Sequence, residues 1–357
     1  MWSETKGTDI LGIEYPIIQA GMAGGYTSPQ LVAAVSNAGG LGSLGAGYLT
    51  PEQIHVAVHE IRSLTDKPFA VNLFIPGSVN DSPEKIGRIN ALMQPYRNEL
   101  GLKSAPHDPE YKQPFEDQIA VLLEEKVPVF SFTFGIPSNE IIEKCKNNGI
   151  TLIGTATTVH EAVKLEACGI DMIVGQGFEA GGHRGTFLHS FEDSLVGTMA
   201  LIPQLVDRVT VPVIASGGIM DGRGIAAALA LGASGVQMGT AFLTCEESMT
   251  HEKHKEALLS SADESTTITR AFSGKPARGI KNKFIVEMAE HTEDLPAYPI
   301  QNALTQDIRR SAAKRNITDY MSMWAGQASA LCTTQSAGQL VAHLVEQTEQ
   351  VFANINK

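Results

Sequence analysis

The feature that best limits the possible folds of this 357-residue chain is a regular alternation of short apolar runs with helix-like runs. Eight apolar runs have the length and flanking turn residues of buried strands, and each of the first seven is followed by a helical run. They span residues 15–20, 41–46, 69–75, 127–134, 149–156, 172–174, 211–219 and 235–242. Such alternation implies parallel strands joined by right-handed crossovers. Eight units over about 240 residues predict a closed (β/α)8 TIM barrel rather than a doubly wound sheet.

Two segments depart from this alternation. Residues 76–114 form a polar, proline-punctuated insertion that is either a lid or a surface excursion. From Thr244 onward the strand rhythm stops and the pattern is helical. We therefore expect an α/β chain with a barrel over 1–243, a helical lid or substrate subdomain over 244–335, and a C-terminal helix over 336–357 that packs on the barrel.

The composition is that of an ordinary globular protein, with 43% hydrophobic and 18% charged residues. A net charge of −12 and the lack of a basic run argue against nucleic acid or a membrane as a partner. The four cysteines stand apart without the spacing of metal ligands, so we expect free thiols and no metal site. The N-terminus lacks a signal-peptide core, and no apolar run reaches membrane-spanning length. These features predict a soluble, cytoplasmic protein.

A glycine-rich loop follows the sixth predicted strand. Residues 175–185 contain five glycines together with Glu179, His183 and Arg184. This many glycines disfavour a helix or a strand, but they allow backbone N–H groups to approach a ligand closely. A histidine in a loop at the end of a buried strand is typical of an active site. Taken alone, the same residues also fit a tight surface loop with an incidental histidine.

Other polar and glycine-rich features fall at the predicted strand ends, where barrel enzymes carry their active sites. They lie at 21–22, 72, 176–183, 216–218 and 237–240. The last two follow strands seven and eight, where backbone N–H groups and a helix N-terminus often hold a phosphate group. We therefore expect a phosphate-bearing ligand at this end of the barrel.

The sequence has neither a Walker loop nor a GxGxxG fingerprint with its acidic partner, which disfavours an NTP-dependent or nicotinamide-only enzyme. A phosphate-bearing cofactor in a (β/α)8 barrel favours flavin mononucleotide (FMN), with pyridoxal phosphate and sugar-phosphate substrates as competitors. No lysine stands at a strand end in the pattern expected of a Schiff base.

Taken together, these motifs resemble the nitronate monooxygenases, formerly called 2-nitropropane dioxygenases, a family of FMN-dependent barrels. The resemblance spans essentially the whole chain and is carried by residues 16–22, 71–74, 175–185, 215–219 and 237–240. The run Met-Trp-Ala-Gly-Gln at 323–327 also resembles the C-terminal signature of the family's nitronate-oxidising class. The histidine-bearing loop is the most specific of these motifs.

Position by position, the resemblance implies that His183 is the catalytic residue. It would act either as a neutral base toward a nitroalkane or as an imidazolium that holds an anionic nitronate. The resemblance also implies FMN contacts from Met22, Asn72, Gln176, Gly181, Gly182, Ser216, Gly217, Gly218, Gln237, Met238, Gly239 and Thr240. Second-tier substrate contacts are Tyr111, Tyr298, Lys314 and Tyr320, for which lid packing or surface charge is an equally good interpretation.

The implied function is oxidative denitrification of alkyl nitronates such as propionate 3-nitronate, with FMN and O₂ and without NAD(P)H, by a monomer or homodimer. Two other functions stay open: an NAD(P)H-dependent FMN reductase acting on a quinone or an enoyl thioester, and a non-catalytic flavin-binding protein. A barrel like that of IMP dehydrogenase would need a nucleophilic cysteine in a strand-end loop. Cys145 and Cys168 instead fall in predicted helices, and Cys245 lies just past the last strand.

Overall fold

The computed structural model describes residues 1–77, 81–102 and 114–355, and its centre is an eight-stranded parallel sheet. The strands are β1 (Ile17–Gln19), β2 (Gly42–Gly45), β3 (Phe69–Phe74), β4 (Val129–Thr133), β5 (Thr151–Ala156), β6 (Met172–Gln176), β8 (Val213–Ser216) and β9 (Gly235–Met238). Their order in the sheet is β1-β9-β8-β6-β5-β4-β3-β2. A parallel bridge between Ile18 and Leu41 brings the two end strands together. The sheet therefore closes, and the predicted (β/α)8 barrel is confirmed.

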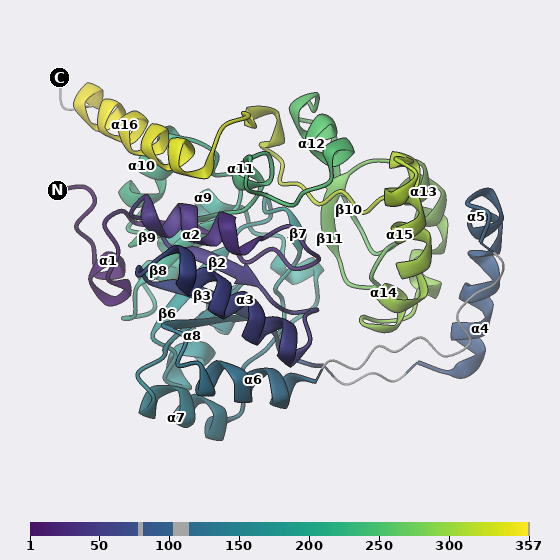
Figure 1. Ribbon diagram of the computed structural model, residues 1–357, viewed down its shortest axis with the longest axis horizontal. Helices are drawn as coiled ribbons and strands as arrows, with labels where there is room; N and C mark the ends of the chain where they lie inside the picture. The colour runs from purple at the N-terminus through teal and green to yellow at the C-terminus, as the bar shows by residue number, and fades with distance from the viewer. Residues whose placement is uncertain (78–80, 103–113, 356–357) are drawn as a thin grey trace.

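Helices surround the barrel and connect its strands (Figure 1). They are α2 (Pro29–Asn37), α3 (Pro51–Leu64), α6 (Phe115–Glu124), α7 (Asn139–Asn147), α8 (Val159–Ala167), α9 (Thr198–Val206) and α10 (Gly222–Ala230). The Ser28 hydroxyl caps α2 by accepting a hydrogen bond from the Leu31 N–H, and Thr50 forms a capping box with Gln53 at the start of α3. In both helices proline follows the cap, a position that needs no N–H donor.

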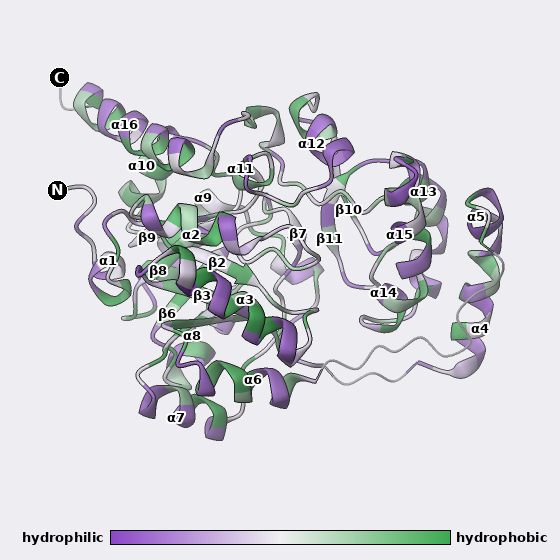
Figure 2. Ribbon diagram, in the orientation of Figure 1, coloured by the Kyte–Doolittle hydropathy of each residue, from purple (hydrophilic) through white to green (hydrophobic). Residues whose placement is uncertain are grey.

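Hydrophobic side chains fill the space between the barrel strands and the surrounding helices. Ile17, Val71, Phe130 and Ile173 are fully buried in one continuous cluster with side chains of those helices. Figure 2 shows hydrophobic colour along the strands and mixed colour on the helices, whose outer faces meet water. Because parallel strands are buried on both faces, they appear in the sequence as continuous apolar runs rather than as a polar–apolar alternation.

The structure differs from the sequence-based prediction at both ends of the barrel segment. The sequence predicts a last strand through Phe242, but β9 ends at Met238 and a short helix, α11 (Thr240–Leu243), follows at once. An apolar run alone does not distinguish a strand from a buried helical turn. A further helix that was not predicted, α1 (Lys6–Leu11), precedes β1 and is capped by Thr5.

The described helices of the insertion lie on the same side of the barrel as most elements of residues 244–335 (Figure 1). Their elements are α4 (Pro83–Leu92), α5 (Gln94–Glu99), α12 (Glu252–Leu259), β10 (Thr266–Thr269), β11 (Ala277–Ile280), α13 (Lys283–Met288), α14 (Ile300–Leu304) and α15 (Gln306–Lys314). Met93, Tyr96, Phe284 and Leu304 belong to a second hydrophobic cluster formed by this region. We propose that these segments make up one subdomain next to the barrel, with the insertion as part of it.

A small antiparallel sheet joins this region to the barrel. Its order is β10-β11-β7, where β7 is the residue pair Gly182–His183 of the glycine-rich loop. The sequence analysis described the region after Thr244 as helical and did not predict the β10–β11 pair, because strands of four residues give too short a pattern to recognise. The pairing attaches the histidine to a second layer of structure outside the barrel.

The C-terminal helix α16 (Ala337–Ile355) packs against α10 and α2 on the outside of the barrel. Leu340, Val341 and Leu344 are among the side chains that it buries. None of the described helices is both long and apolar enough to span a lipid bilayer. All four cysteines are free thiols, as the sequence predicts.

Candidate active site at the mouth of the barrel

A cavity lies at the C-terminal ends of the barrel strands, and the residues that the sequence analysis assigned to FMN all line it together with His183. These residues are Met22, Asn72, Gln176, Gly181, Gly182, Ser216, Gly217, Gly218, Gln237, Met238, Gly239 and Thr240. Tyr26, Tyr48, Phe134 and Trp324 add aromatic walls that the resemblance did not single out as contacts. The fold thus brings residues from widely separated strand ends around one space.

The ends of β8 and β9 present backbone N–H groups at this cavity. Within the described part of the chain, the amides of Gly217, Gly218, Gly239 and Thr240 donate to no other residue. Gly217 and Gly218 have φ values of 119° and 72°, which lie in the region that favours glycine. Successive free amides in such a turn form a concavity suited to an anion. This donor set fits a phosphate group at the place where barrels commonly bind one.

Polar side chains of β3 and β9 line the same cavity. Asn72 Nδ2 donates to the Ser131 hydroxyl at 2.9 Å, which leaves the side-chain carbonyl of Asn72 free to accept from a ligand. Gly21 packs directly on this residue, since a Cβ at Gly21 would lie 2.4 Å from the Cβ of Asn72. Gln237 of β9 also lines the cavity, and its side-chain amide has no hydrogen-bond partner among the described residues. Such amide groups fit the carbonyl- and N–H-bearing edge of a flavin ring.

Gln176 also lines the cavity, but its side-chain amide is occupied within the glycine-rich loop. Nε2 donates to the His183 carbonyl at 3.0 Å. Oε1 accepts from the Gly185 N–H at 2.8 Å and from Arg184 Nη1 at 3.1 Å. Gln176 therefore holds the backbone on both sides of the histidine.

Arg184 is the anchor of this loop. It is 1% exposed, and its Nη1 donates to the carbonyls of Gln176 at 3.0 Å and Gly177 at 2.6 Å. Its Nη2 donates to the Ser194 carbonyl at 2.8 Å. A guanidinium can serve several carbonyls at once, which suits it to stabilise an irregular loop.

Glu179 has a structural role as well. Its two carboxylate oxygens accept from the Thr198 N–H at 3.0 and 2.9 Å, and one of them accepts from the Thr198 hydroxyl at 2.9 Å. These contacts give the first N–H group of α9 a hydrogen-bond acceptor and place a negative charge at the N-terminus of the helix. Of the three titratable side chains in the loop, only His183 lines the cavity.

The His183 ring is held by Ser273. The two side chains lie 2.8 Å apart, from His183 Nε2 to Ser273 Oγ. The Ser273 hydroxyl accepts from the Lys275 N–H at 3.3 Å and lies 3.1 Å from the Lys275 carbonyl, so its single proton goes either to that carbonyl or to His183 Nε2. When the serine proton goes to the carbonyl, the neutral imidazole donates Nε2–H to Ser273 and its Nδ1 is unprotonated. Ser273 itself is 1% exposed, which fixes the position of the ring.

His183 is neutral in this environment. Burial, together with the positive charges of Lys275 and Arg309, lowers its pKa to about 3. Lys275 is itself desolvated, and burial lowers its pKa to about 8. Its Nζ donates to the Thr186 carbonyl at 3.1 Å and lies 4.7 Å from the centre of the Phe134 ring. The cavity thus combines a neutral imidazole with nearby positive charge.

Three aromatic rings surround the imidazole. The ring centres of Phe134, Tyr298 and Trp324 lie 5.8, 5.9 and 5.4 Å from that of His183. Phe134 has a φ of 77°, which is rare for a bulky residue and is typical of functional sites. Trp324 belongs to the C-terminal signature, and the adjacent Gly326 N–H donates to the Thr240 hydroxyl at 3.0 Å. This signature therefore forms part of the cavity wall.

Two phenols have buried hydroxyls without a hydrogen-bond partner among the described residues. Tyr48 lines the cavity, and the ring of Tyr298 lies beside that of His183. Burial raises the pKa of both. The two hydroxyls also act on each other, which lowers the pKa of Tyr48 and raises that of Tyr298, and the charge of Arg309 lowers both. An unpaired buried donor is costly unless a ligand satisfies it. Tyr48 follows β2 by three residues and was missed by the sequence analysis. The sequence feature that could have identified Tyr48 is its position just after the end of a strand.

The residues that the sequence analysis named as substrate contacts do not lie together in the structure. Tyr298 lies beside His183, as described above. Lys314 is exposed at the end of α15, and the Tyr320 hydroxyl accepts from Lys283 Nζ at 2.8 Å and donates to Glu99. Neither Lys314 nor Tyr320 is among the residues that line the cavity. Tyr111 lies outside the described residues.

A TIM barrel with free amides at its last two strand ends and a half-buried, neutral histidine in the same cavity has the arrangement of a barrel enzyme. The family model described as "Nitronate monooxygenase" matches residues 4–347, and the chain belongs to this family of oxidoreductases. A protein of Staphylococcus haemolyticus named probable nitronate monooxygenase is 49% identical over 354 residues, covering 99% of each chain. The structural relatives agree with this assignment.

The nitroalkane oxidase of Streptomyces ansochromogenes, known from crystal structures, matches with a TM-score of 0.90 and 39% identity, covering 98% of this chain and 99% of its own. FabK from Thermotoga maritima matches with a TM-score of 0.79 and 32% identity, covering 99% of this chain and 98% of its own. Both similarities extend through the barrel and the C-terminal region.

Proposed function

We propose that the cavity binds FMN and that the protein oxidatively denitrifies alkyl nitronates such as propionate 3-nitronate. The amides at the ends of β8 and β9 would hold the phosphate, and Asn72 and Gln237 would meet the ring and the ribityl chain. The observation that carries the proposal is that the phosphate-suited amides and the neutral His183 line the same cavity. Its support from relatives is the family membership and the 39% identity to a nitroalkane oxidase.

The protein side of the reaction is binding and positioning. FMN, when bound, supplies the electron transfer and the chemistry with O₂. Lys275 and Arg309 give the histidine's surroundings a positive field, which attracts an anionic nitronate. The hydroxyl of Tyr48, which lines the cavity and has no hydrogen-bond partner among the described residues, would donate to a nitro oxygen. The aromatic rings around His183 keep water away from the reacting carbon.

For His183, the lowered pKa supports the neutral-base role rather than the imidazolium role. With Nε2–H given to Ser273, Nδ1 is the atom that accepts the α-proton of a neutral nitroalkane. Replacing His183 by Asn should lower turnover of the nitroalkane by about 10²–10⁴-fold and leave FMN bound. Unchanged turnover would contradict the catalytic role. His189→Asn, a change in an exposed histidine, serves as the control.

The test of the function is an oxygen-free mixing experiment with untagged, FMN-loaded protein. Propionate 3-nitronate alone should change the absorbance of the bound flavin, and admission of O₂ should release nitrite with repeated turnover. NADH alone should leave the flavin spectrum unchanged over the same time. Rapid bleaching by NADH without any reaction with the nitronate would instead establish the reductase. Protein that takes up no FMN would contradict both functions.

Two further expectations from the sequence belong to this proposal. We propose that the enzyme works in the cytoplasm, in keeping with its four free cysteines. We also propose a monomer or a homodimer with nitronate and O₂ as its small-molecule partners. Light scattering of the FMN-loaded protein measures the oligomeric state directly.

A further inference from the structure

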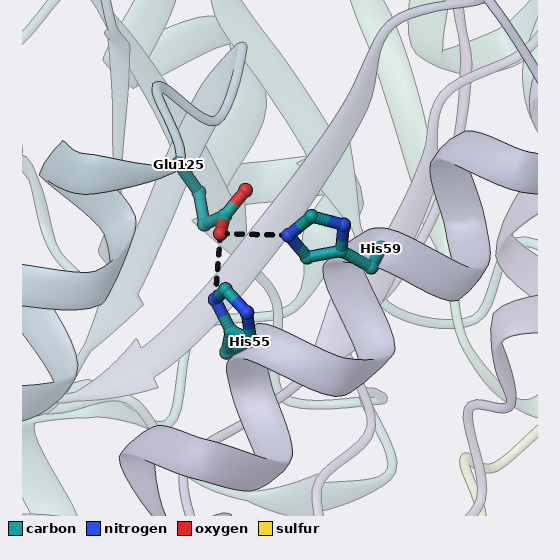
Figure 3. Close-up of side chains that lie close together, drawn as sticks. All are labelled: His55, His59 and Glu125. Carbon is teal, nitrogen blue, oxygen red and sulfur yellow. Dashed lines mark hydrogen bonds and ion pairs between the residues drawn. The ribbon is translucent and has the colours of Figure 1, made fainter.

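A cluster of metal-binding side chains lies on the outer surface of the barrel, away from the cavity. His55 and His59 stand one turn apart on α3, and both rings face Glu125, the C-cap residue that follows α6 (Figure 3). His55 Nδ1 lies 2.7 Å and His59 Nε2 lies 3.1 Å from the same carboxylate oxygen, Oε1. None of the three residues lines the cavity. The cluster is therefore separate from the proposed FMN site.

The three ligand atoms already lie close to the spacing that a metal ion needs. They are all within 4.8 Å of one another. Zinc bonds to imidazole nitrogen and carboxylate oxygen measure about 2.0–2.2 Å, so neighbouring ligand atoms in a tetrahedral site lie about 3.3–3.5 Å apart. Small ring rotations that move both nitrogens outward from Oε1 would reach this spacing. The side chains of His55 and His59 are 49% and 61% exposed, so they have room to rotate.

The carboxylate is held in place from its other side. Arg62, one turn further along α3, donates from Nη1 to Glu125 Oε2 at 2.6 Å, and its Nη2 donates to the Glu125 carbonyl. The Glu125 side chain is only 7% exposed. The ion pair occupies Oε2 and leaves Oε1 directed at the two imidazoles. An outer partner that orients a ligand in this way is common in metal sites, although its charge also weakens the attraction of the carboxylate for a cation.

We propose that His55, His59 and Glu125 bind a divalent transition-metal ion of the zinc class. Two imidazoles and one carboxylate suit Zn²⁺ and its neighbours, whereas Mg²⁺ and Ca²⁺ prefer sites made of oxygen ligands. Three protein ligands leave coordination positions for water on the exposed side. Binding requires unprotonated ligand nitrogens, and the proton of each neutral ring moves to its other nitrogen.

The consequence of such binding is structural. The ion would join α3 to the end of α6, two neighbouring helices of the outer layer that are also held together by Arg62. Because α3 precedes β3 and α6 precedes β4, the site supports the outer layer of the barrel rather than its mouth. Bound metal should therefore stabilise the fold without changing the turnover of the enzyme.

The test uses untagged, FMN-loaded protein that has been treated with a chelator and then titrated calorimetrically with ZnCl₂. The wild type should bind one equivalent, and Zn²⁺ should raise its thermal unfolding midpoint. His59→Ala and Glu125→Gln should each lower the affinity by about tenfold or more and abolish the thermal shift. MgCl₂ should have no effect. Circular dichroism without metal checks that each variant is folded.

A matched control distinguishes this site from ordinary binding to surface histidines. His160 Nδ1 and His189 Nε2 lie 3.3 Å apart in another exposed pair, and His160→Ala should leave the equivalent of Zn²⁺ in place. Loss of binding in His160→Ala, with retention in His59→Ala, would overturn the proposal. Equal binding by the wild type and a His55→Ala/His59→Ala double variant would also overturn it.

Discussion

His183 Nε2 and Ser273 Oγ lie 2.8 Å apart, although the two residues are separated by 90 positions in the sequence. The pairing of β7 with β11, in which His183 lies opposite Ala277, brings the histidine loop against the C-terminal region that carries Ser273. The serine hydroxyl holds the ring position, and by donating to the Lys275 carbonyl it would also select the Nε2–H tautomer of the imidazole. Ser273 is a positioning residue for the proposed base.

Replacing Ser273 by Ala should lower kcat of a nitroalkane by about 2–10-fold, the effect of losing one hydrogen bond of about 0.5–1.5 kcal/mol. KM and FMN occupancy should change little, because the serine does not line the cavity. Ser273→Thr, which keeps the hydroxyl, should recover part of the loss. An equal loss in the Thr and Ala variants would show that packing rather than the hydrogen bond is responsible.

Most of the site was predictable because it lies at strand ends. Asn72, Gly218 and Gln237 follow or end recognisable apolar runs, and a barrel brings all such ends together. Ser273 was not predictable in the same way. It comes from a turn between two short strands that have no clear pattern, and its contact with His183 depends on tertiary pairing alone. Tyr48 was missed because nothing in the local sequence shows that its hydroxyl is left without a partner.

The roles of Glu179 and Arg184 illustrate a second limit. Both stand in the glycine-rich loop with His183, and by residue type alone each could be a catalytic side chain as readily as the histidine. In the structure Arg184 serves backbone carbonyls and Glu179 caps α9. Charged residues in an irregular loop often satisfy its unpaired backbone groups. The sequence shows where the chemistry lies, but the hydrogen bonds show which side chain remains available.

The phenol hydroxyls give a prediction in which stability and activity change in opposite directions. Tyr48→Phe removes a buried hydroxyl that has no partner among the described residues, so the free energy of unfolding of the substrate-free protein should stay equal or rise by up to about 1 kcal/mol. The same change should raise KM for a nitronate several-fold, because it removes a donor to the nitro group. Urea unfolding and steady-state kinetics measure the two effects. A lower stability with unchanged KM would assign Tyr48 a purely structural role.

Gly218 gives a prediction about the proposed phosphate site. Its φ of 72° costs a residue with a Cβ about 1–2 kcal/mol, and a Cβ here would lie 3.2 Å from the Cβ of Glu179. Gly218→Ala should therefore weaken FMN binding by about tenfold or more, which flavin fluorescence after dilution would detect. Gly338→Ala is the control, since a Cβ there meets nothing within 4 Å. Equal FMN retention in both variants would argue against a phosphate held by this turn.

Two desolvated histidines, the half-buried His183 and the buried His254, should make stability depend on pH in the acidic range. The pKa of His183 is lowered to about 3 and that of His254 to about 4, both mainly by burial. Between an unfolded pKa near 6.5 and these values, the unfolded chain binds protons that the folded chain does not. The free energy of unfolding should therefore fall as pH decreases from about 6.5 to about 4, by about 1.4 kcal/mol per pH unit for each histidine.

His183→Gln should remove one of these two contributions and make the decrease with pH shallower by about 1.4 kcal/mol per unit. The measurement is urea unfolding of wild type and variant at several pH values between about 4.5 and 6.5. His343→Gln, a change at an exposed position, should leave the slope as in the wild type. A slope that is the same in all three proteins would mean that His183 takes up its proton in the folded state, and the neutral-base role would then be lost.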